Sequence, residues 1–122
     1  MQKIIVTGGL GFIGSNLIKI LLKKNYYVIN LDKVTYASNF YNIKNFKKNR
    51  NYSFKKININ DKKKFNNVLK NFKPTGIFNL AAETHVDRSI DGPREFINSN
   101  ILGVFNLLES FRDYSKNSKK AR

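Results

Sequence analysis

The 122-residue sequence has no cysteine, a single histidine and only eight acidic residues. The absence of cysteine excludes disulfide scaffolds, thiolate metal sites and cysteine nucleophiles, and no metal site is predicted. No apolar run approaches the roughly 20 residues that a membrane-spanning helix needs. The start of the chain does not resemble the long apolar core of a secretory signal either. We therefore expect a cytoplasmic protein with no membrane partner.

The shortage of acidic residues leaves a net charge of +15, from 23 Lys and Arg against 8 Asp and Glu. Such an excess can indicate a nucleic-acid partner. Here the excess is lysine, whereas arginine is the residue suited to bidentate contacts with bases and phosphates. Nucleic-acid binding is therefore kept only as the least favoured alternative.

Short apolar runs alternate with segments of helical periodicity along the whole chain. Such alternation predicts a parallel β-sheet that helices cover on both faces. We predict a single, partial α/β domain of residues 1–122, a doubly wound parallel sheet of the Rossmann type with strand order 3-2-1-4 that is truncated after about four strands. The expected strands are 3–7, 26–31, 52–59 and 76–80, and the expected helices follow the first glycines, lie near 40–48, run from an Asn60 N-cap to Pro74, and begin at Pro93.

The first predicted strand leads directly into a glycine-rich turn. Gly9, Gly11 and Gly14 satisfy the G-x-G-x-x-G spacing, and Gly8, Gly11 and Gly14 satisfy G-x-x-G-x-x-G. Such glycines allow a tight turn, a close approach of the backbone to a pyrophosphate and close helix packing. Asp32 stands 18 residues after Gly14, at the end of the second strand, where an acid accepts hydrogen bonds from a ribose. The combination predicts a dinucleotide site, and the acid favours NAD over NADP.

The loop after the fourth predicted strand is the third part of the candidate site. In a sheet of this order, the crevice lies between the first and fourth strands. Small residues there would let the backbone lie against a cofactor, with polar side chains beside it. For His85 we favour a loop-bracing hydrogen bond over catalysis, and Asp87 with Arg88 can form an ion pair. The loop contains Ala81, Ala82, Glu83, Thr84, His85, Asp87 and Arg88.

Four segments, TGGLGFIG, LDKVTYASN, NLAAETHVDRSIDGP and NSNILGVFNLLES, resemble the N-terminal part of nucleotide-sugar 4,6-dehydratases, most closely those that act on dTDP-glucose. These enzymes belong to the extended short-chain dehydrogenase/reductase superfamily. The resemblance implies an NAD-dependent carbon–oxygen lyase that oxidises the sugar at C4, removes water across C5 and C6 and returns the hydride to C6. It also implies cofactor contacts from Gly8, Gly11, Phe12, Ile13, Gly14, Asp32, Lys33, Thr35, Asn58, Ile59, Leu80, Ala81, Ala82, Glu83 and Ser99, and a sugar contact from Thr84.

The chain departs from the family pattern at a few positions and in length. Asn58 stands where an aspartate is usual, although its amide oxygen can still accept a hydrogen bond. The family's Tyr-x-x-x-Lys helix and Thr-Asp-Glu segment are absent, so no catalytic residue is assigned and turnover by these 122 residues alone is not expected. Tyr52 and Lys56 match the Tyr-x-x-x-Lys spacing, but they lie in a predicted strand, so we reject this pair as the catalytic motif.

The resemblance also bears on assembly. It implies a homodimer formed through the helix at 93–115. An unprotected edge at the fourth strand is a second reason to expect self-association. The alternatives to this assignment are a nucleotide-sugar epimerase, a non-catalytic NAD-binding module and the nucleic-acid binder.

Overall fold

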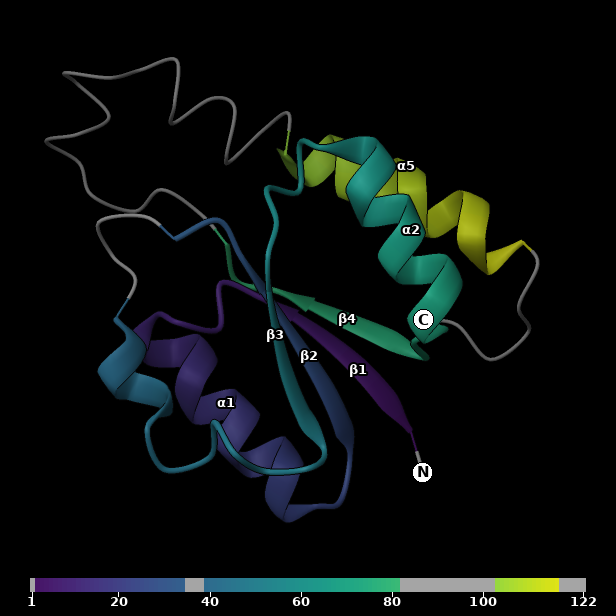
Figure 1. The fold of residues 1–122 in the computed structure, drawn as a ribbon. Helices are drawn as coiled ribbons and strands as arrows, with labels where there is room; N and C mark the ends of the chain where they lie inside the picture. Colours follow the sequence, from purple (N-terminus) through teal and green to yellow (C-terminus); the bar gives the residue numbers. More distant parts are fainter. Residues whose placement is uncertain (1, 35–38, 82–102, 117–122) are drawn as a thin grey trace, which may run out of the picture.

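The computed structural model describes residues 2–34, 39–81 and 103–116 and contains one parallel β-sheet. Its strands lie in the order β3-β2-β1-β4 (Figure 1). This confirms the predicted α/β class and the predicted strand order. The strands are β1 (Lys3–Thr7), β2 (Tyr27–Asp32), β3 (Tyr52–Lys56) and β4 (Gly76–Asn79).

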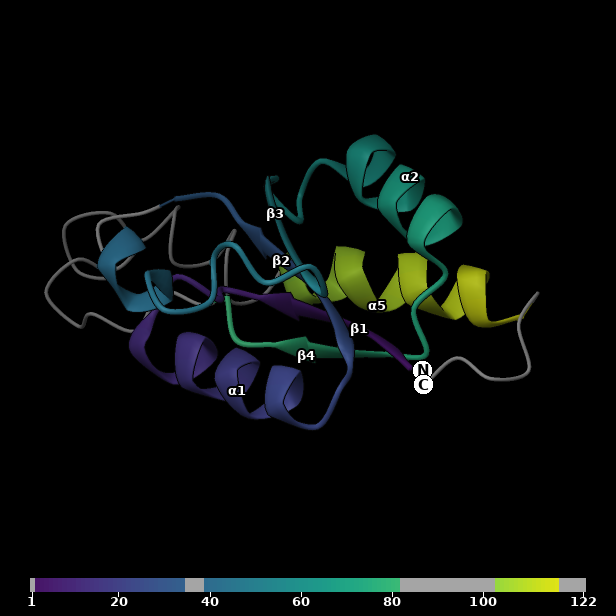
Figure 2. The same cartoon turned by 60° about the horizontal axis from the view of Figure 1, so that its bottom comes forward.

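Helices cover both faces of the sheet (Figure 2). Helix α1 (Phe12–Lys23) and the 3₁₀ helix η1 (Phe40–Ile43) lie on one face, while α2 (Lys62–Phe72) and α5 (Gly103–Ser115) lie on the other. Successive side chains of a strand point to opposite faces, so each central strand supplies two cores. In β1, Ile4 and Val6 pack with the α1 side, and Ile5 packs with the α2 side.

The third strand is shorter than predicted, because the chain turns after Lys56. The Ile57 amide still donates to the Asp32 carbonyl at 3.1 Å, and the Asn58 side chain then accepts from the Asn60 amide at 2.9 Å. The predicted Asn60 N-cap of the following helix is wrong by one residue. Asp61 is the N-cap, and its carboxylate accepts from the Lys64 amide at 3.2 Å.

Another predicted helix is shorter than expected, and one more can be compared with the structure only in part. The helix expected near 40–48 is only the short 3₁₀ helix η1, which is followed by turns. The predicted helix that begins at Pro93 is described from Gly103 onward, and its first part lies outside the described residues. Among the helices that the structure describes, none combines the length and the apolar character needed to cross a membrane.

Candidate functional site

The glycine turn joins the carboxyl end of β1 to the start of α1. Gly8 has a φ of +73°, and its amide donates to the Leu31 carbonyl at 2.9 Å. A Cβ atom on Gly8 would lie 2.8 Å from backbone atoms of Leu80 and Ala81. Glycine is therefore required here both by the backbone conformation and by the close passage of the segment after β4.

Two further glycines of the turn are also required by packing within the chain, but Gly11 is not. A Cβ on Gly9 would lie 2.2 Å from the Asn30 amide oxygen, and one on Gly14 would lie 2.4 Å from the Gly8 carbonyl oxygen. A Cβ on Gly11 would meet Gly8 alone among the described residues, at 3.4 Å. Gly11 is therefore a glycine of this turn that close contacts with the described residues do not require.

Helix α1 begins at this turn, and no capping side chain accepts a hydrogen bond from its first backbone amides. Its N-cap is Gly11, and its first turn contains no acidic residue. Phe12 and Ile13 are 77% and 71% exposed. Unpaired amides and the helix dipole favour an anion at such an end, as the pyrophosphate prediction requires.

Asp32 lies at the carboxyl end of β2, 5% exposed. One carboxylate oxygen accepts from the Leu10 amide at 3.1 Å, and the other accepts from the Val34 amide at 2.7 Å. Asp32 thus braces the glycine turn against the segment after β2, a role that sequence reasoning missed. A carboxylate oxygen can accept more than one hydrogen bond, so this bracing is compatible with the predicted contact to a ribose.

Asn30 is a second residue that sequence reasoning missed. It is fully buried in the middle of β2, where its oxygen accepts from the Gly9 amide at 2.9 Å and its nitrogen donates to the Tyr52 hydroxyl at 3.1 Å. The signal in the sequence was an amide inside an otherwise apolar strand, since buried polar groups need partners. Asn30 thus fixes the position of the glycine turn through its hydrogen bond with the Gly9 amide.

Thr7 joins the carboxyl ends of β1 and β4 and also went unnoticed in the sequence. Its buried hydroxyl donates to the Asn79 side-chain oxygen at 2.5 Å. The Thr7 hydroxyl oxygen in turn accepts from the Leu80 and Ala81 amides at 3.1 and 3.2 Å. These contacts hold the segment after β4 directly over Gly8, so β1 and β4 together form one side of the candidate site.

The remaining predicted contacts fall into three groups. Leu80 is 38% exposed beside the turn, and Lys33 follows Asp32 as a partly buried residue. Asn58 is exposed, whereas the side chain of Ile59 packs in the core with Phe65 of α2. The residues Thr35, Ala82, Glu83, Thr84, His85, Asp87, Arg88 and Ser99 lie outside the described residues.

The rejected Tyr52 and Lys56 pair does lie in a strand. Four residue steps along the strand place their Cα atoms about 13 Å apart, so the lysine cannot stack on the tyrosine. Burial raises the pKa of Tyr52 above its usual value, the hydrogen bond with Asn30 opposes the rise, and the charge of Asp32 adds to it. A buried phenol of this kind is a structural partner of Asn30 rather than a catalytic base at neutral pH.

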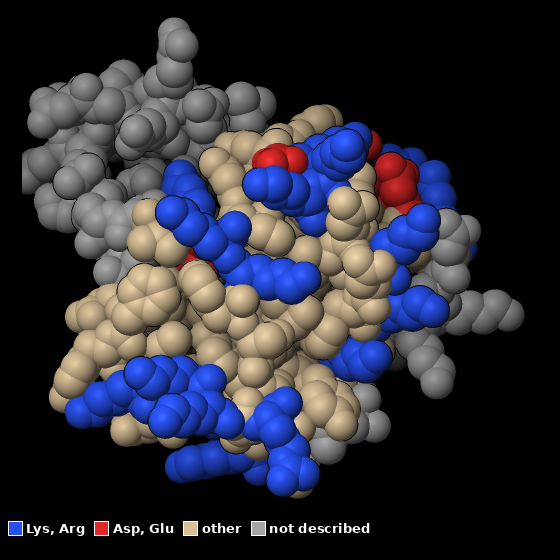
Figure 3. Space-filling model, in the orientation of Figure 1, with Lys and Arg blue, Asp and Glu red and all other residues tan. Residues whose placement is uncertain are grey.

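The basic residues are distributed widely over the surface. On the face drawn in Figure 3, Lys and Arg form several groups separated by uncharged surface rather than one continuous stripe. The net charge of +15 attracts anions of any kind, including the phosphates of a dinucleotide. This distribution gives nucleic-acid binding no additional support.

A parallel sheet of order 3-2-1-4, a glycine turn that opens a helix, and an acid at the end of β2 define a Rossmann-type fold. Comparisons with known proteins identify the family within this fold class. The family model described as GDP-mannose 4,6 dehydratase matches residues 5–122. The chain belongs to this family, and the resemblance to nucleotide-sugar 4,6-dehydratases is confirmed.

Individual relatives show how much of each protein the chain matches. A dTDP-glucose 4,6-dehydratase of Neisseria meningitidis serogroup B is 44% identical over 115 residues, which are 93% of this chain and 32% of the relative. The structure of a dTDP-glucose 4,6-dehydratase from Streptomyces venezuelae, solved with NAD bound, matches with a TM-score of 0.87 and 35% identity, over 93% of this chain and 37% of that one.

A structure with a different activity matches almost as well. UDP-glucose 4-epimerase from Thermotoga maritima, solved with UDP-glucose, has a TM-score of 0.83 and 33% identity, over 93% of this chain and 35% of that one. The chain spans about a third of the length of the curated relatives that it matches.

Proposed function

We propose that the chain binds NAD at the carboxyl ends of β1, β2 and β4, as the cofactor-binding part of a cytoplasmic nucleotide-sugar 4,6-dehydratase. The proposed reaction of the whole protein converts dTDP-glucose to dTDP-4-keto-6-deoxyglucose. The observation that carries the proposal is Gly11, the N-cap of α1, where an added Cβ would come no closer than 3.4 Å to any described residue, at the position where the fold would place a pyrophosphate. Similarity to dTDP-glucose 4,6-dehydratases supports the choice of reaction.

Within this proposal, each part of the site has a defined task. The first amides of α1 bind the pyrophosphate, while Asp32 orients the adenosine ribose and disfavours the additional phosphate of NADP. Bound NAD supplies a hydride acceptor for the sugar. The further proposed cofactor contacts are Lys33, Thr35, Asn58, Ile59, Leu80, Ala81, Ala82, Glu83 and Ser99, and Thr84 is the proposed sugar contact.

Replacing Asp32 with asparagine should weaken NAD binding by about tenfold, because a hydrogen bond to a charged acceptor contributes about 1.5 kcal/mol or more. The change should weaken NADP binding less, since the charge that repels its additional phosphate is removed. Calorimetric titration of both cofactors would measure the two effects. The matched control is Asp61→Asn, which removes the charge of a partly exposed N-cap outside the site and should leave the ratio of affinities unchanged. An unchanged ratio in Asp32→Asn would contradict the assigned role.

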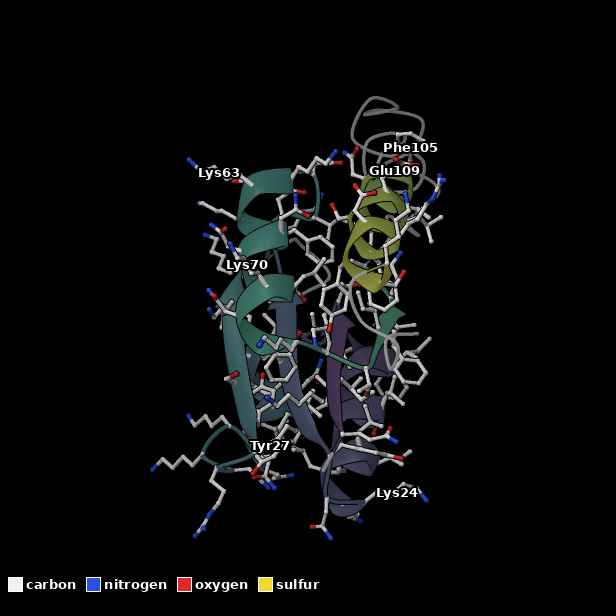
Figure 4. The ribbon with its side chains drawn as sticks, turned by 90° about the vertical axis from the view of Figure 1, so that its right-hand side faces the viewer. Lys24, Tyr27, Lys63, Lys70, Phe105 and Glu109 are labelled. Carbon is white, nitrogen blue, oxygen red and sulfur yellow. The ribbon has the colours of Figure 1, made fainter. Side chains whose placement is uncertain are left out.

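We also propose that the chain forms a homodimer through the helix that includes α5. Phe105 and Leu108 support this, because they are 58% and 60% exposed on α5. In Figure 4, Phe105 lies on the outer side of α5, away from α2. Changing both residues to serine should shift sedimentation from dimer to monomer. Tyr41→Ser, at a 66% exposed aromatic residue in η1, is the control and should not. A parent chain that sediments as a monomer would refute this proposal.

A nucleotide-sugar epimerase is the second candidate, favoured by the similarity to UDP-glucose 4-epimerase. Both activities need the same NAD site, so the cofactor experiment does not separate them. The product formed from the nucleotide sugar by the whole protein does, because dehydration removes a water molecule from the sugar and epimerisation does not.

A further inference from the structure

Two polar side chains lie within the core on the α1 side of the sheet. Asn30 in β2 is fully buried, and Tyr52 at the start of β3 is 8% exposed in a cluster of buried residues that includes Val28, Ile43 and Phe46. A phenylalanine ring would fill the space of Tyr52 without burying a hydroxyl group. Because burying a polar group has a cost unless it is hydrogen-bonded, the hydroxyl of Tyr52 needs an explanation other than packing.

Hydrogen bonds lead from this hydroxyl to the glycine turn. The Asn30 side-chain nitrogen donates to the Tyr52 hydroxyl at 3.1 Å, and the Asn30 oxygen accepts from the Gly9 amide at 2.9 Å. Tyr52 is paired with Val28 in the sheet, so its hydroxyl reaches Asn30 as a diagonal neighbour on the same face. The two bonds therefore connect β3, through β2, to the turn that follows β1 (Figure 1).

The position of the Tyr52 hydroxyl is set by the packing of its ring. Phe46 meets the ring edge-on, with 5.0 Å between the ring centroids and an angle of 81° between the planes. Aromatic pairs favour this arrangement, and a tyrosine side chain has only two rotatable bonds that place its ring. A ring fixed by the core thus presents its hydroxyl to Asn30 at a defined place.

The other end of this connection is equally restricted. The Gly9 amide can only donate a hydrogen bond, so the Asn30 oxygen must face it and the Asn30 nitrogen must face away. The Tyr52 hydroxyl is the partner that the structure gives to this buried nitrogen. Without the hydroxyl, the nitrogen would be buried and unpaired, which favours conformations in which Asn30 moves. Gly9 is in direct contact with the Asn30 side chain, so the turn would move with it.

We propose that Tyr52 is a positioning residue of the cofactor site, which acts through Asn30 on the Gly9 amide and keeps the glycine turn in the conformation that receives the pyrophosphate. The proposal rests on the proposed function, because Gly11, at the start of α1, is only two residues from Gly9. When only a fraction of the molecules have the competent turn, the apparent affinity for NAD falls by that fraction.

The first test is calorimetric titration of NAD into the full chain with Tyr52→Phe. We expect binding to weaken roughly fivefold, the effect of one neutral hydrogen bond. The matched control is Tyr114→Phe, because the Tyr114 hydroxyl also donates a hydrogen bond, to the Pro74 carbonyl at 2.6 Å, but in the core on the opposite face of the sheet. Both variants should lose stability in urea, yet Tyr114→Phe should bind NAD like the parent chain.

The second test is hydrogen exchange of the Gly9 amide, followed by NMR on the isotope-labelled full chain without NAD. The amide of Ile5, in the middle of β1, serves as the internal reference. In Tyr52→Phe, exchange should accelerate more at Gly9 than at Ile5, because the turn is released while the sheet remains formed. In Tyr114→Phe, any acceleration should not favour Gly9. A residue that only stabilises the fold would change the two amides alike.

The outcomes separate this proposal from the proposed function. Parent affinity for NAD in Tyr52→Phe, or equal acceleration at Gly9 and Ile5, would overturn the role of Tyr52 and leave the NAD site standing. A parent chain that binds no NAD would overturn the proposed function, and the exchange comparison would still decide whether Tyr52 holds the turn. Should Tyr52→Phe not fold, a Gly9 amide that exchanges like an exposed amide in the parent chain would also overturn the proposal.

Discussion

Replacing Gly14 with alanine is expected to lower the free energy of unfolding by roughly 2 to 3 kcal/mol, whereas the same change at Gly11 should lower it by less than about 1 kcal/mol. The new Cβ at position 14 would lie 2.4 Å from the Gly8 oxygen and 2.9 Å from the Gly9 Cα. These are backbone atoms, so α1 must move away from the turn. The gain in helix propensity from alanine, about 1 kcal/mol, is too small to offset that movement.

Urea unfolding of both variants, followed by circular dichroism, measures the two values. Gly11→Ala is the matched control, because it makes the same chemical change three residues earlier, where the Cβ has room. If both variants lost the same stability, the assignment of Gly14 to helix packing would be wrong.

The second large expected effect is a loss of NAD affinity. It is expected at Gly11, where the substitution should leave the fold intact. Gly11→Ala should weaken NAD binding by roughly thirtyfold, or about 2 kcal/mol, because the methyl group would occupy the space in front of the α1 amides. The loss corresponds to hydrogen bonds with a charged group that can no longer form at the proper distance.

Calorimetric titration of NAD into Gly11→Ala and the parent chain measures this loss, with the unfolding curves above as the check on folding. Ser53→Ala, in β3 and away from the turn, should bind NAD like the parent chain. A Gly11→Ala variant that is stable and binds NAD with the parent affinity would show that the pyrophosphate does not lie against Gly11.

The strand order and the glycine turn could be predicted because each follows from a local pattern. Apolar runs that alternate with helical periodicity permit few arrangements, and right-handed crossovers reduce these further. Glycine spacing next to a strand end indicated the turn. The sequence did not distinguish the tasks of the glycines, since the close contacts of Gly8 and Gly9 are with residues distant in the sequence, Leu80 and Asn30, and that of Gly14 with Gly8 depends on how the turn folds back on the helix.

The errors and omissions have similar physical causes. Asn60 and Asp61 are both good N-cap residues, and only the turn that Asn58 makes decides that Asp61 is the cap. The bracing by Asp32 depends on a long-range hydrogen bond from the Leu10 amide that no local pattern encodes.

The central claim is that this chain forms a dinucleotide site from the glycine turn and Asp32. The most direct test is titration of NAD into the purified 122-residue chain by calorimetry, with circular dichroism to show that the chain is folded. The account predicts saturable binding of one NAD per chain, tighter than that of NADP. A folded chain that releases no heat with NAD and leaves it unbound in equilibrium dialysis would contradict the claim.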